Sequence, residues 1–309
     1  MNWIRTVQGR VATETLGLIL PHEHLFTDLR GLTVPDYAQA DPDHVVSVMS
    51  PLLAEAHAAG VTMLVECTPP GVGRNIHMLK RLAQVTPVHI VAATGVYREA
   101  FHPSAFKSMS LEELAGLWTR ELTEGIEGTS AQAGFIKLAV SDEGITELEA
   151  RNLKAAALAS QRTGAVIASH TQGGQNAHQE MNILEAAGLD LARFIWVHTQ
   201  SEPDPAAHLA TVRRGAYVEF DNLAWNEQSD QIVDYVLALL GAGYGERILL
   251  SHDAGWYSPG LPGGQPQGGL RGYTVLTSEF IPALRARGVG DDAIHLLTVT
   301  NPARAFAFS

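Results

Sequence analysis

The stretch "GLILPHEHL" (17–25) places two histidines one residue apart at the end of an apolar run. Residues i and i+2 of a strand face the same side, so His22 and His24 are expected to point in one direction. Neutral imidazole is a common nitrogen ligand for divalent transition metals. The pair alone does not decide between a metal site and an ordinary polar strand end.

Four later apolar runs also carry a metal-binding or ionisable group. These groups are Lys137 within "GFIKLAV", His170 at the end of "AVIASH", His198 at the end of "RFIWVH", and Asp253 directly after "RILLSH". Parallel strands closed into a barrel direct their carboxyl ends to one mouth, so these side chains are expected to meet the two histidines of the first strand. Several histidines with a carboxylate in one mouth predict a transition-metal site with open coordination positions.

Lys137 is one of four lysines and the only one within a strongly apolar strand. Buried unpaired lysine is rare, so its position needs a reason. One interpretation is an ion pair with Glu66 or Glu219, or an amine that extends to the mouth of the barrel. The other is a carbamate, formed from the neutral amine and carbon dioxide, that bridges two cations. This carbamate, Asp253 and a bridging hydroxide would balance most of the charge of two divalent metals.

The elements that must position these groups are eight short apolar runs rich in β-branched residues. They cover residues 16–20, 61–67, 88–94, 134–140, 165–170, 193–198, 216–220 and 247–252. Segments with helical periodicity separate them, and two begin with a capping box, Ser110 with Glu113 and Thr146 with Glu149. The alternation predicts an α/β fold, a (β/α)8 TIM barrel, with one domain over residues 1–309. A doubly wound open sheet is the rival, but no glycine-rich dinucleotide fingerprint follows the first strand.

Composition limits the partners and the compartment. The chain has 309 residues and a formal net charge of -12 at pH 7, which argues against nucleic acid and anionic membrane surfaces as partners. It has no signal-peptide pattern and no apolar run long enough to span a bilayer. Cys67 is the only cysteine, so no internal disulfide can form, and it is interpreted as a packing residue. A soluble, cytoplasmic protein is the prediction.

With these residues placed, nearly the whole chain resembles the phosphotriesterase family of the amidohydrolase superfamily, which includes the phosphotriesterase-like lactonases. The motifs that carry the resemblance are "LPHEHL", "GVGRNI", "ATGVY", "GFIKLA", "SHTQ", "VH", "EFD", "LLSHD" and "TVTNPARAF". Lysine on the fourth strand followed by histidines that end the fifth and sixth strands is highly specific. The resemblance implies a homodimeric hydrolase with a binuclear metal centre.

The resemblance also implies a role for each site residue. By position, the more buried metal would lie between His22, His24 and Asp253, the more exposed one between His170 and His198, and carbamylated Lys137 would bridge both. Lactonases have a tyrosine beside this centre, and Tyr97 in "GVY" matches it. Zinc suits imidazole with carboxylate, and manganese, cobalt and iron are alternatives.

The departures from the family pattern fall in loops that contact substrate. Lactonases usually carry an arginine after the aspartate that ends strand seven, where this chain has Asn222. Strand six continues as "HTQSEPD", without the glycine- and aspartate-containing turn common in lactonases. The glycine- and proline-rich stretch 258–269, with Trp256 and Tyr257 before it, is expected to form part of the site. These differences bear on the substrate and leave the metal chemistry intact.

The leading prediction is a metal-dependent hydrolase of lactones or related small carboxylic esters, with promiscuous phosphotriesterase activity. A bridging hydroxide would attack the substrate, Asp253 would accept the proton, and Tyr97 would donate a hydrogen bond to the hydroxide or the developing oxyanion. A dedicated organophosphate triesterase (aryldialkylphosphatase) is the alternative chemistry. A non-catalytic metal-binding barrel is the alternative of another class.

Most of the thirteen histidines are expected to lie outside the site. Those predicted in helices or their flanks are His44, His77, His178, His208 and His295. His89 begins the third strand, the wrong end for a barrel site. His102 follows that strand in a loop and is placed where it could approach the site. His252 should point away from it, as a packing residue or a support for the ligands.

Overall fold

A computed structural model of the chain describes residues 2–223, 229–265 and 272–308. Within these residues, two parallel sheets have the strand orders β3-β4-β5 and β6-β7-β8-β9-β10-β11. The strands are β3 (Leu18–Glu23), β4 (Val61–Glu66), β5 (His89–Val91), β6 (Ala93–Val96), β7 (Phe135–Ala139), β8 (Ile167–His170), β9 (Phe194–Val197), β10 (Tyr217–Phe220) and β11 (Ile248–Leu250). All the predicted strand positions are therefore occupied, in the predicted order.

Two junctions join the sheets into one closed barrel. β5 and β6 are consecutive and are separated only by Ala92, so they replace the single strand predicted over 88–94. At the other junction, the Asp253 amide donates to the His22 carbonyl oxygen at 3.2 Å, and the His22 amide donates to Ser251 Oγ at 3.0 Å. The fold is an α/β fold, the predicted (β/α)8 TIM barrel.

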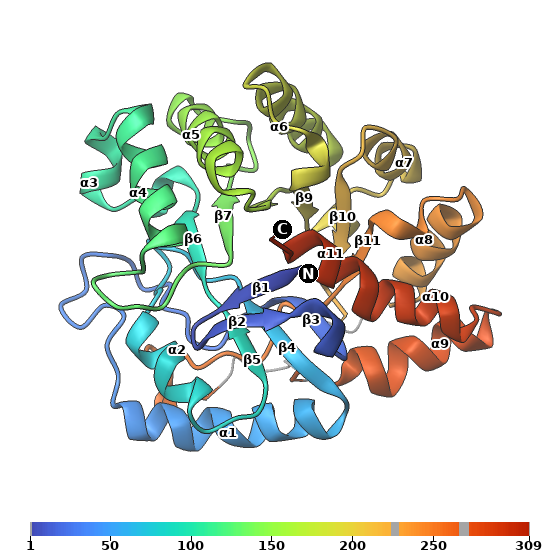
Figure 1. Ribbon diagram of the computed structural model, residues 1–309, viewed down its shortest axis with the longest axis horizontal. Coiled ribbons are helices and arrows are strands. Elements are labelled where there is room, and N and C mark those ends of the chain that lie inside the picture. Colours follow the sequence, from blue (N-terminus) through green and yellow to red (C-terminus); the bar gives the residue numbers. More distant parts are fainter. Residues whose placement is uncertain (1, 224–228, 266–271, 309) are drawn as a thin grey trace.

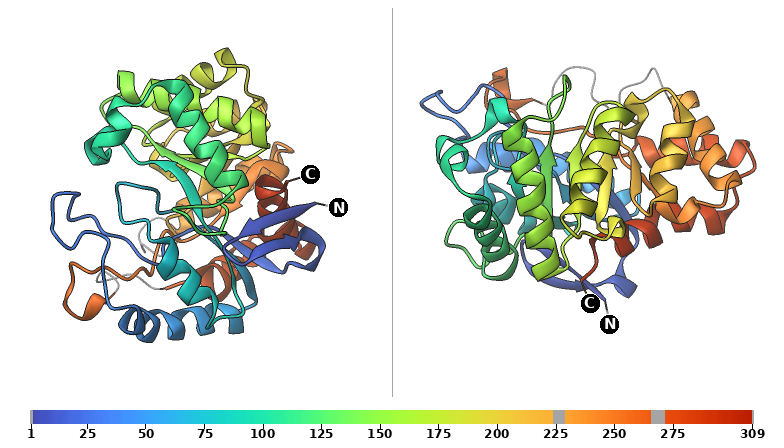
Figure 2. Two further views of the ribbon diagram at one scale, coloured as in Figure 1. Left: turned by 60° about the vertical axis from the view of Figure 1, so that its left-hand side comes forward. Right: turned by 90° about the horizontal axis from the view of Figure 1, so that it is seen from above.

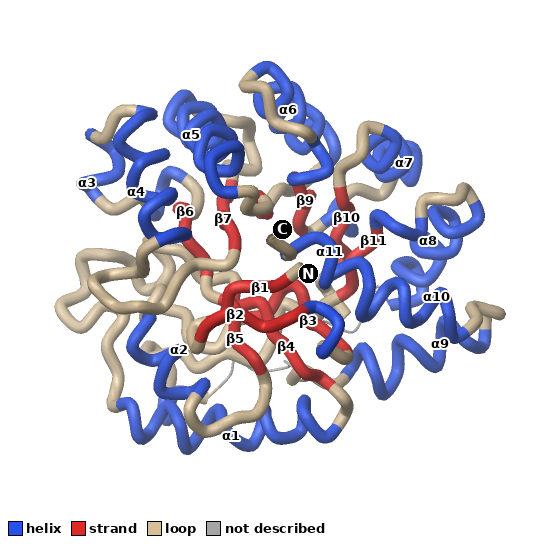
Figure 3. The backbone as a smooth tube through the Cα atoms, in the orientation of Figure 1, coloured by secondary structure: helices blue, strands red, loops and turns tan. Residues whose placement is uncertain are grey.

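The helices form the outer layer of the barrel, and the strands lie inside them (Figures 1 and 3). The helices are α1 (Pro42–Ala58), α2 (Ile76–Ala83), α3 (Ser104–Ser108), α4 (Leu111–Thr123), α5 (Glu147–Thr163), α6 (Gly174–Ala186), α7 (Pro205–Arg213), α8 (Ser229–Gly241), α9 (Ile281–Ala286), α10 (Asp291–His295) and α11 (Asn301–Phe306). In the described part of the chain, none of them combines the length and the apolar character that a membrane span requires.

Local sequence signals explain where these helices begin and end. Both predicted capping boxes form, with Ser110 and Glu113 starting α4 and Thr146 and Glu149 starting α5. In each box, the hydroxyl accepts from the backbone amide three residues on, and the glutamate accepts from the capping residue's amide. α5 ends at Gly164, whose φ of 78° is accessible to glycine at little cost.

The apolar core has two layers, as the alternation of side chains along the strands requires. One layer packs between strands and helices and includes Leu64, Ile136 and Trp196. The other fills the barrel interior, with residues such as Met63 and Phe135. The interior is therefore a packed core, which leaves only the mouth at the carboxyl ends of the strands for a polar site.

The amino-terminal segment forms an antiparallel hairpin that the sequence did not predict, β1 (Trp3–Thr6) with β2 (Gly9–Ala12). Trp3 and Phe308 form a backbone bridge, so the two ends of the chain lie together. Figure 2 shows both termini at one end of the barrel. The first barrel strand also extends further than predicted, to Glu23, which brings His22 inside the strand.

Candidate metal centre

A cavity of about 130 Å³ lies at the carboxyl ends of the barrel strands. All seven residues predicted for the site line it: His22, His24, Tyr97, Lys137, His170, His198 and Asp253. They come from β3, β6, β7, β8, β9, β11 and the residues directly after these strands. The structure thus brings together side chains spread over most of the sequence, while their roles as ligands stay a prediction.

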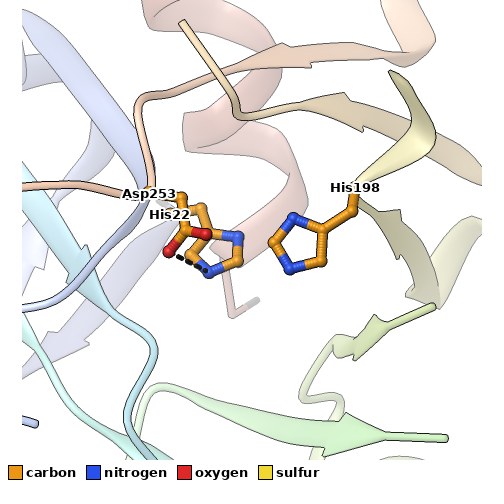
Figure 4. A group of neighbouring side chains, drawn as sticks. All are labelled: His22, His198 and Asp253. Atoms are coloured by element: carbon orange, nitrogen blue, oxygen red, sulfur yellow. Dashed lines mark ion pairs between the residues drawn. The ribbon is translucent and has the colours of Figure 1, made fainter. Parts of the chain in front are cut away.

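The carboxylate of Asp253 lies beside the two imidazoles of the first strand. Its Oδ1 is 3.1 Å from His24 Nε2 and 3.6 Å from His22 Nε2. His22, His198 and Asp253 each offer one ligand atom, and these atoms lie within 4.8 Å of one another. Figure 4 shows His22 and Asp253 side by side with the ring of His198 facing them. The rings of His170 and His198 are also close, with centroids 4.4 Å apart.

Two buried acids of β10 and its end orient the histidines. His22 Nδ1 lies 2.9 Å from both Glu219 Oε1 and Asp221 Oδ2, and His198 Nδ1 lies 2.7 Å from Asp221 Oδ1. These contacts occupy Nδ1 and leave Nε2 of each ring for the cavity. A carboxylate behind a histidine is the usual support of a metal ligand. Asp221 was not among the residues predicted for the site, although its place at a strand end was a signal.

Burial and neighbouring charges fix the protonation of this group. Burial, followed by the charge of Lys137, lowers the pKa of His22 to about 4, so its ring is neutral at pH 7. Burial alone would raise the pKa of Asp221, but His198 and His22 outweigh it and hold that pKa well below its usual range. Burial and the adjacent Asp221 carboxylate raise the pKa of Glu219 well above its usual range. The neutral ring of His22 is the form that binds a metal.

Lys137 is 1% exposed in the middle of β7, and its amine faces the same cavity. Among the described residues, Nζ has no hydrogen-bond partner. The sequence had left open an ion pair with Glu66 or Glu219, which these residues do not form, and an amine that extends to the mouth of the barrel, which agrees with the cavity lining. Glu66 instead accepts from the hydroxyl of Thr68 at 2.5 Å and from the backbone amide of Thr68 at 3.2 Å. A buried amine without a partner is costly, and its conversion to a ligating group would remove that cost.

Tyr97 and Arg98 approach His170 from the end of β6. The Tyr97 hydroxyl lies 3.3 Å from His170 Nδ1, and Arg98 Nη2 lies 3.2 Å from His170 Nε2. Burial lowers the pKa of His170 well below its usual range, and nearby His198 and Lys137 lower it further. Arg98 was not among the residues predicted for the site, because an arginine in a loop carries no signal by itself.

Two of the site residues have a strained backbone. His198 has a φ of 64° and Asp253 a φ of 52°, in the left-handed region that non-glycine residues rarely adopt. Such strain persists only where the surrounding contacts enforce it, and it concentrates at functional sites. At Asp253 the enforcing contacts include the bond to the His22 carbonyl oxygen across the barrel junction.

The remaining histidines lie where the sequence predicted. His44, His77, His178, His208 and His295 all lie in helices, and His89 begins β5. His252 is buried outside the cavity, with Nδ1 2.6 Å from Glu23 Oε1 and Nε2 accepting from the Leu276 amide. His102 does not line the cavity, because its Nε2 donates to the Tyr97 carbonyl oxygen.

Among its described residues, the loop after β11 contributes one side chain besides Asp253 to the cavity lining. Trp256 lines the cavity, but Tyr257 turns away to stack on Phe26, with centroids 5.7 Å apart, and to contact His44 at 2.9 Å. The predicted loop over 258–269 lies partly outside the described residues. Its described part includes a short turn at Pro262–Gly264.

The donor set fits a metal centre. The cavity offers imidazole nitrogens that are oriented from behind, one carboxylate and a buried amine without a partner. Nitrogen and carboxylate donors of this kind, with positions left open for substrate, are typical of catalytic transition-metal sites.

Comparison with known proteins decides the family. The model of the phosphotriesterase family matches residues 2–306. The chain belongs to the phosphotriesterase family. The phosphotriesterase homology protein of Mycobacterium tuberculosis is 31% identical over 320 residues, which cover 99% of this chain and 98% of that one. The aryldialkylphosphatase of Saccharolobus solfataricus is 27% identical, and the match covers 96% of this chain and 97% of that one.

Solved structures agree with this membership. A double mutant of the organophosphorus hydrolase from Deinococcus radiodurans superposes with a TM-score of 0.88 at 33% identity, covering 98% of this chain and 96% of that one. This phosphotriesterase-family chain is a hydrolase that acts on ester bonds of small molecules. The family has a binuclear metal centre, and the chain has grouped residues that could hold a metal ion.

Proposed function

We propose that this member of the phosphotriesterase family is a binuclear metal-dependent hydrolase of lactones or related carboxylic esters, with weaker activity on phosphotriesters. The observation that carries the proposal is Lys137. Its buried amine has no partner among the described residues, yet it lines the same cavity as four histidines and Asp253. A carbamate on this amine supplies the anionic bridge that a pair of cations requires.

The ligands follow from the positions of the side chains. The more buried cation would be held by His22, His24 and Asp253. The more exposed cation would be held by His170 and His198, and carbamylated Lys137 would bind both cations. When bound, such a pair supplies hydroxide at neutral pH and polarises the substrate oxygen. Zinc suits these donors, with manganese, cobalt or iron as alternatives.

The residues of the chain supply the proton transfers and the positioning. The Asp253 side chain is 25% exposed, so it can accept the nucleophile's proton and release it to solvent. The Tyr97 hydroxyl beside His170 would donate a hydrogen bond to the oxygen on which negative charge develops.

Two observations bear on the substrate. Tyr97 lies beside His170, and one similar structure, at a TM-score of 0.87 and 32% identity, derives from a "weak promiscuous lactonase template". The relative named aryldialkylphosphatase supports a dedicated organophosphate triesterase as the second candidate. We also propose a cytoplasmic homodimer, because the free, buried Cys67 suits a reducing compartment and the family resemblance implies a dimer.

The test combines metal analysis with a substrate panel. Protein prepared with added zinc and bicarbonate should contain about two metals per chain and hydrolyse lactones with a higher kcat/KM than an aryl dialkyl phosphate. The reverse ratio would favour the triesterase. A metal content well below one per chain after such a preparation would refute the binuclear centre.

A further inference from the structure

Arg98 places a positive charge next to two residues of the cavity wall. Its Nη2 lies 3.2 Å from His170 Nε2 and 3.4 Å from the Tyr97 hydroxyl, and both of these residues line the cavity. The side chain is 25% exposed, so part of it can be reached from solvent.

The charge of Arg98 is only partly compensated. Its Nη1 donates to Asp142 Oδ2 at 3.0 Å, and this carboxylate is 44% exposed. Its Nη2 contacts only a ring nitrogen and a phenol, and its Nε is buried without a hydrogen-bond partner among the described residues. A guanidinium is suited to bidentate binding of a carboxylate or similar anion, and this one pairs with a single carboxylate by one nitrogen.

The overall charge of the chain makes this local cation significant. A net charge of -12 repels anionic small molecules, so an anionic substrate needs a local positive charge at the site. Lys137 does not serve this purpose in the proposed enzyme, because its amine would be converted to an anionic carbamate. Arg98 is then the cation beside the predicted catalytic groups.

We propose that Arg98 is a specificity-determining residue that selects compact substrates carrying an anionic group, such as a carboxylate, next to the scissile ester. This inference rests on the proposed function, since it names the substrate class for the same site. The ester would lie between Tyr97 and the metal ligands, and the anion would bind Nη2 of Arg98.

The size and lining of the cavity agree with a compact substrate. Its volume of about 130 Å³ is close to that of a cavity that holds one benzene-sized molecule. Leu29, Val72 and Trp256 line it and form an apolar surface for the carbon skeleton. The site therefore suits a substrate that has one anionic group, one ester and a short carbon skeleton.

The test uses a matched pair of lactones that differ by one carboxylate, γ-butyrolactone and 5-oxotetrahydrofuran-2-carboxylate. The readout is the ratio of kcat/KM for the carboxylated lactone to that for the neutral one. Charge-assisted hydrogen bonds are stronger than neutral ones, so Arg98→Met should lower this ratio about tenfold or more. Arg98→Lys should restore part of it, because the charge returns without the planar fork.

Asp142→Asn is the matched variant with the opposite expectation. It removes the carboxylate that competes for Arg98, so the ratio should rise above that of the wild type. An Arg98→Met variant that loses activity equally on both lactones would show that Arg98 only supports the site, and would overturn the proposal. A ratio unchanged in Arg98→Met would overturn it as well.

A binding measurement separates this inference from the proposed function. Calorimetric titration of metal-free protein with 5-oxotetrahydrofuran-2-carboxylate should show binding that weakens with added salt in the wild type and is strongly reduced in Arg98→Met. If the metal-loaded wild type hydrolyses neither lactone, the proposed function fails, while this titration still decides the role of Arg98. Equal binding by wild type and Arg98→Met would refute the inference whatever the activity.

Discussion

At the scale of single residues, the site contains buried ionisable groups with polar atoms that the protein leaves without hydrogen-bond partners. Lys137 Nζ and Glu219 Oε2 are both buried without hydrogen-bond partners among the described residues. Leaving such groups unsatisfied costs free energy, so their retention indicates a ligand or a chemical role. Both carboxylate oxygens of Asp221, in contrast, accept hydrogen bonds, which come from His198, His22 and Gln200.

Replacing Lys137 should remove the metals. In Lys137→Ala the bridging anion cannot form, so metal content should fall below half of the wild-type value, measured by mass spectrometry of the purified protein. Added acetate or propionate should restore part of the metal and activity by occupying the space of the lost side chain. Lys154→Ala, at an exposed lysine of α5, is the control and should keep full metal content. Full metal content in Lys137→Ala would rule out the carbamate.

Replacing Asp221 should weaken metal binding without removing a predicted ligand. Asp221→Asn keeps the shape but loses the charge that orients His22 and His198, so metal affinity should fall about 10–100-fold. Competition with a chelator measures this change. Asp230→Asn on the surface of α8 should leave the affinity unchanged. Unaltered affinity in Asp221→Asn would mean that the histidines do not depend on this carboxylate.

At the scale of elements, the ends of the strands position the site, and their spacing depends on close backbone contact. Gly95 in β6 has a φ of 110° and pairs with Lys137 in β7. A side chain at Gly95 would overlap the carbonyl oxygen of Lys137. The two strands can therefore approach at this point only because residue 95 is glycine.

Gly95→Ala should accordingly destabilise the barrel next to the site. A backbone clash in addition to left-handed strain should lower the free energy of unfolding by roughly 2–5 kcal/mol, measured by denaturant titration. Gly144→Ala is the matched control, with a φ of 132° and no atom within 4 Å of the added carbon. It should lose only about 1–2 kcal/mol from strain. Equal losses in both variants would contradict the strand-contact explanation.

Glu180 of α6 links that helix to β8, since it accepts from Ser169 Oγ and Thr171 Oγ1, each at 2.5 Å. Burial raises its pKa to about 8. The unfolded chain releases this proton near pH 4.5 and the folded one near pH 8. The contribution of Glu180 to stability is therefore complete below pH 4.5 and is lost as the pH rises to about 8.

Glu180→Gln should remove this pH dependence. The amide stays neutral at both pH values, so the variant does not lose stability as the pH rises. The difference in free energy of unfolding, variant minus wild type, should therefore be larger at pH 8.5 than at pH 5 by on the order of a few kcal/mol. Denaturant midpoints of metal-free protein at the two pH values measure the difference. Glu185→Gln, at an exposed position of the same helix, should show no such change. Parallel pH profiles for Glu180→Gln and wild type would contradict a raised pKa.

At the scale of the whole molecule, one end of the barrel carries the predicted metal site and the other end carries the packed termini. The predicted ligands and Arg98 lie at the carboxyl ends of the strands, whereas the termini and the β1–β2 hairpin lie together at the other end (Figure 2). There Phe308 stacks on Trp3 at 5.2 Å, and the Arg5 guanidinium lies 3.7 Å from the Phe308 ring. In barrels of this kind, one face carries the chemistry and the opposite face contributes stability.

Phe308→Ala should therefore affect stability and leave the metal site unchanged. Phe308 is 3% exposed, so its truncation should lower the free energy of unfolding by about 3–5 kcal/mol. Val85→Ala, at an exposed position, should change it by about 0.5 kcal/mol or less. Denaturant titration with metal analysis of the folded protein separates the two effects. Loss of metal from folded Phe308→Ala would show that the two ends are coupled.

The sequence by itself determined the barrel and the meeting of His22, His24, Lys137, His170, His198 and Asp253 at its mouth, whereas Tyr97 was predicted from the family resemblance. The barrel and the meeting of the six residues follow from local information: strand and helix periods set the alternation of elements, and the residues that end parallel strands must meet at one mouth. The capping boxes at Ser110 and Thr146 were equally local, and they were predicted correctly.

Only the tertiary structure decided which partner each of these groups meets. It placed Asp221 behind His22 and His198, left Lys137 without a carboxylate, turned Tyr257 away from the cavity and brought Arg98 to His170. The hairpin of β1 and β2 also depends on contacts with the other end of the chain. The physical reason is that side-chain partners are set by packing between strands far apart in sequence, and periodicity along the chain does not encode that packing.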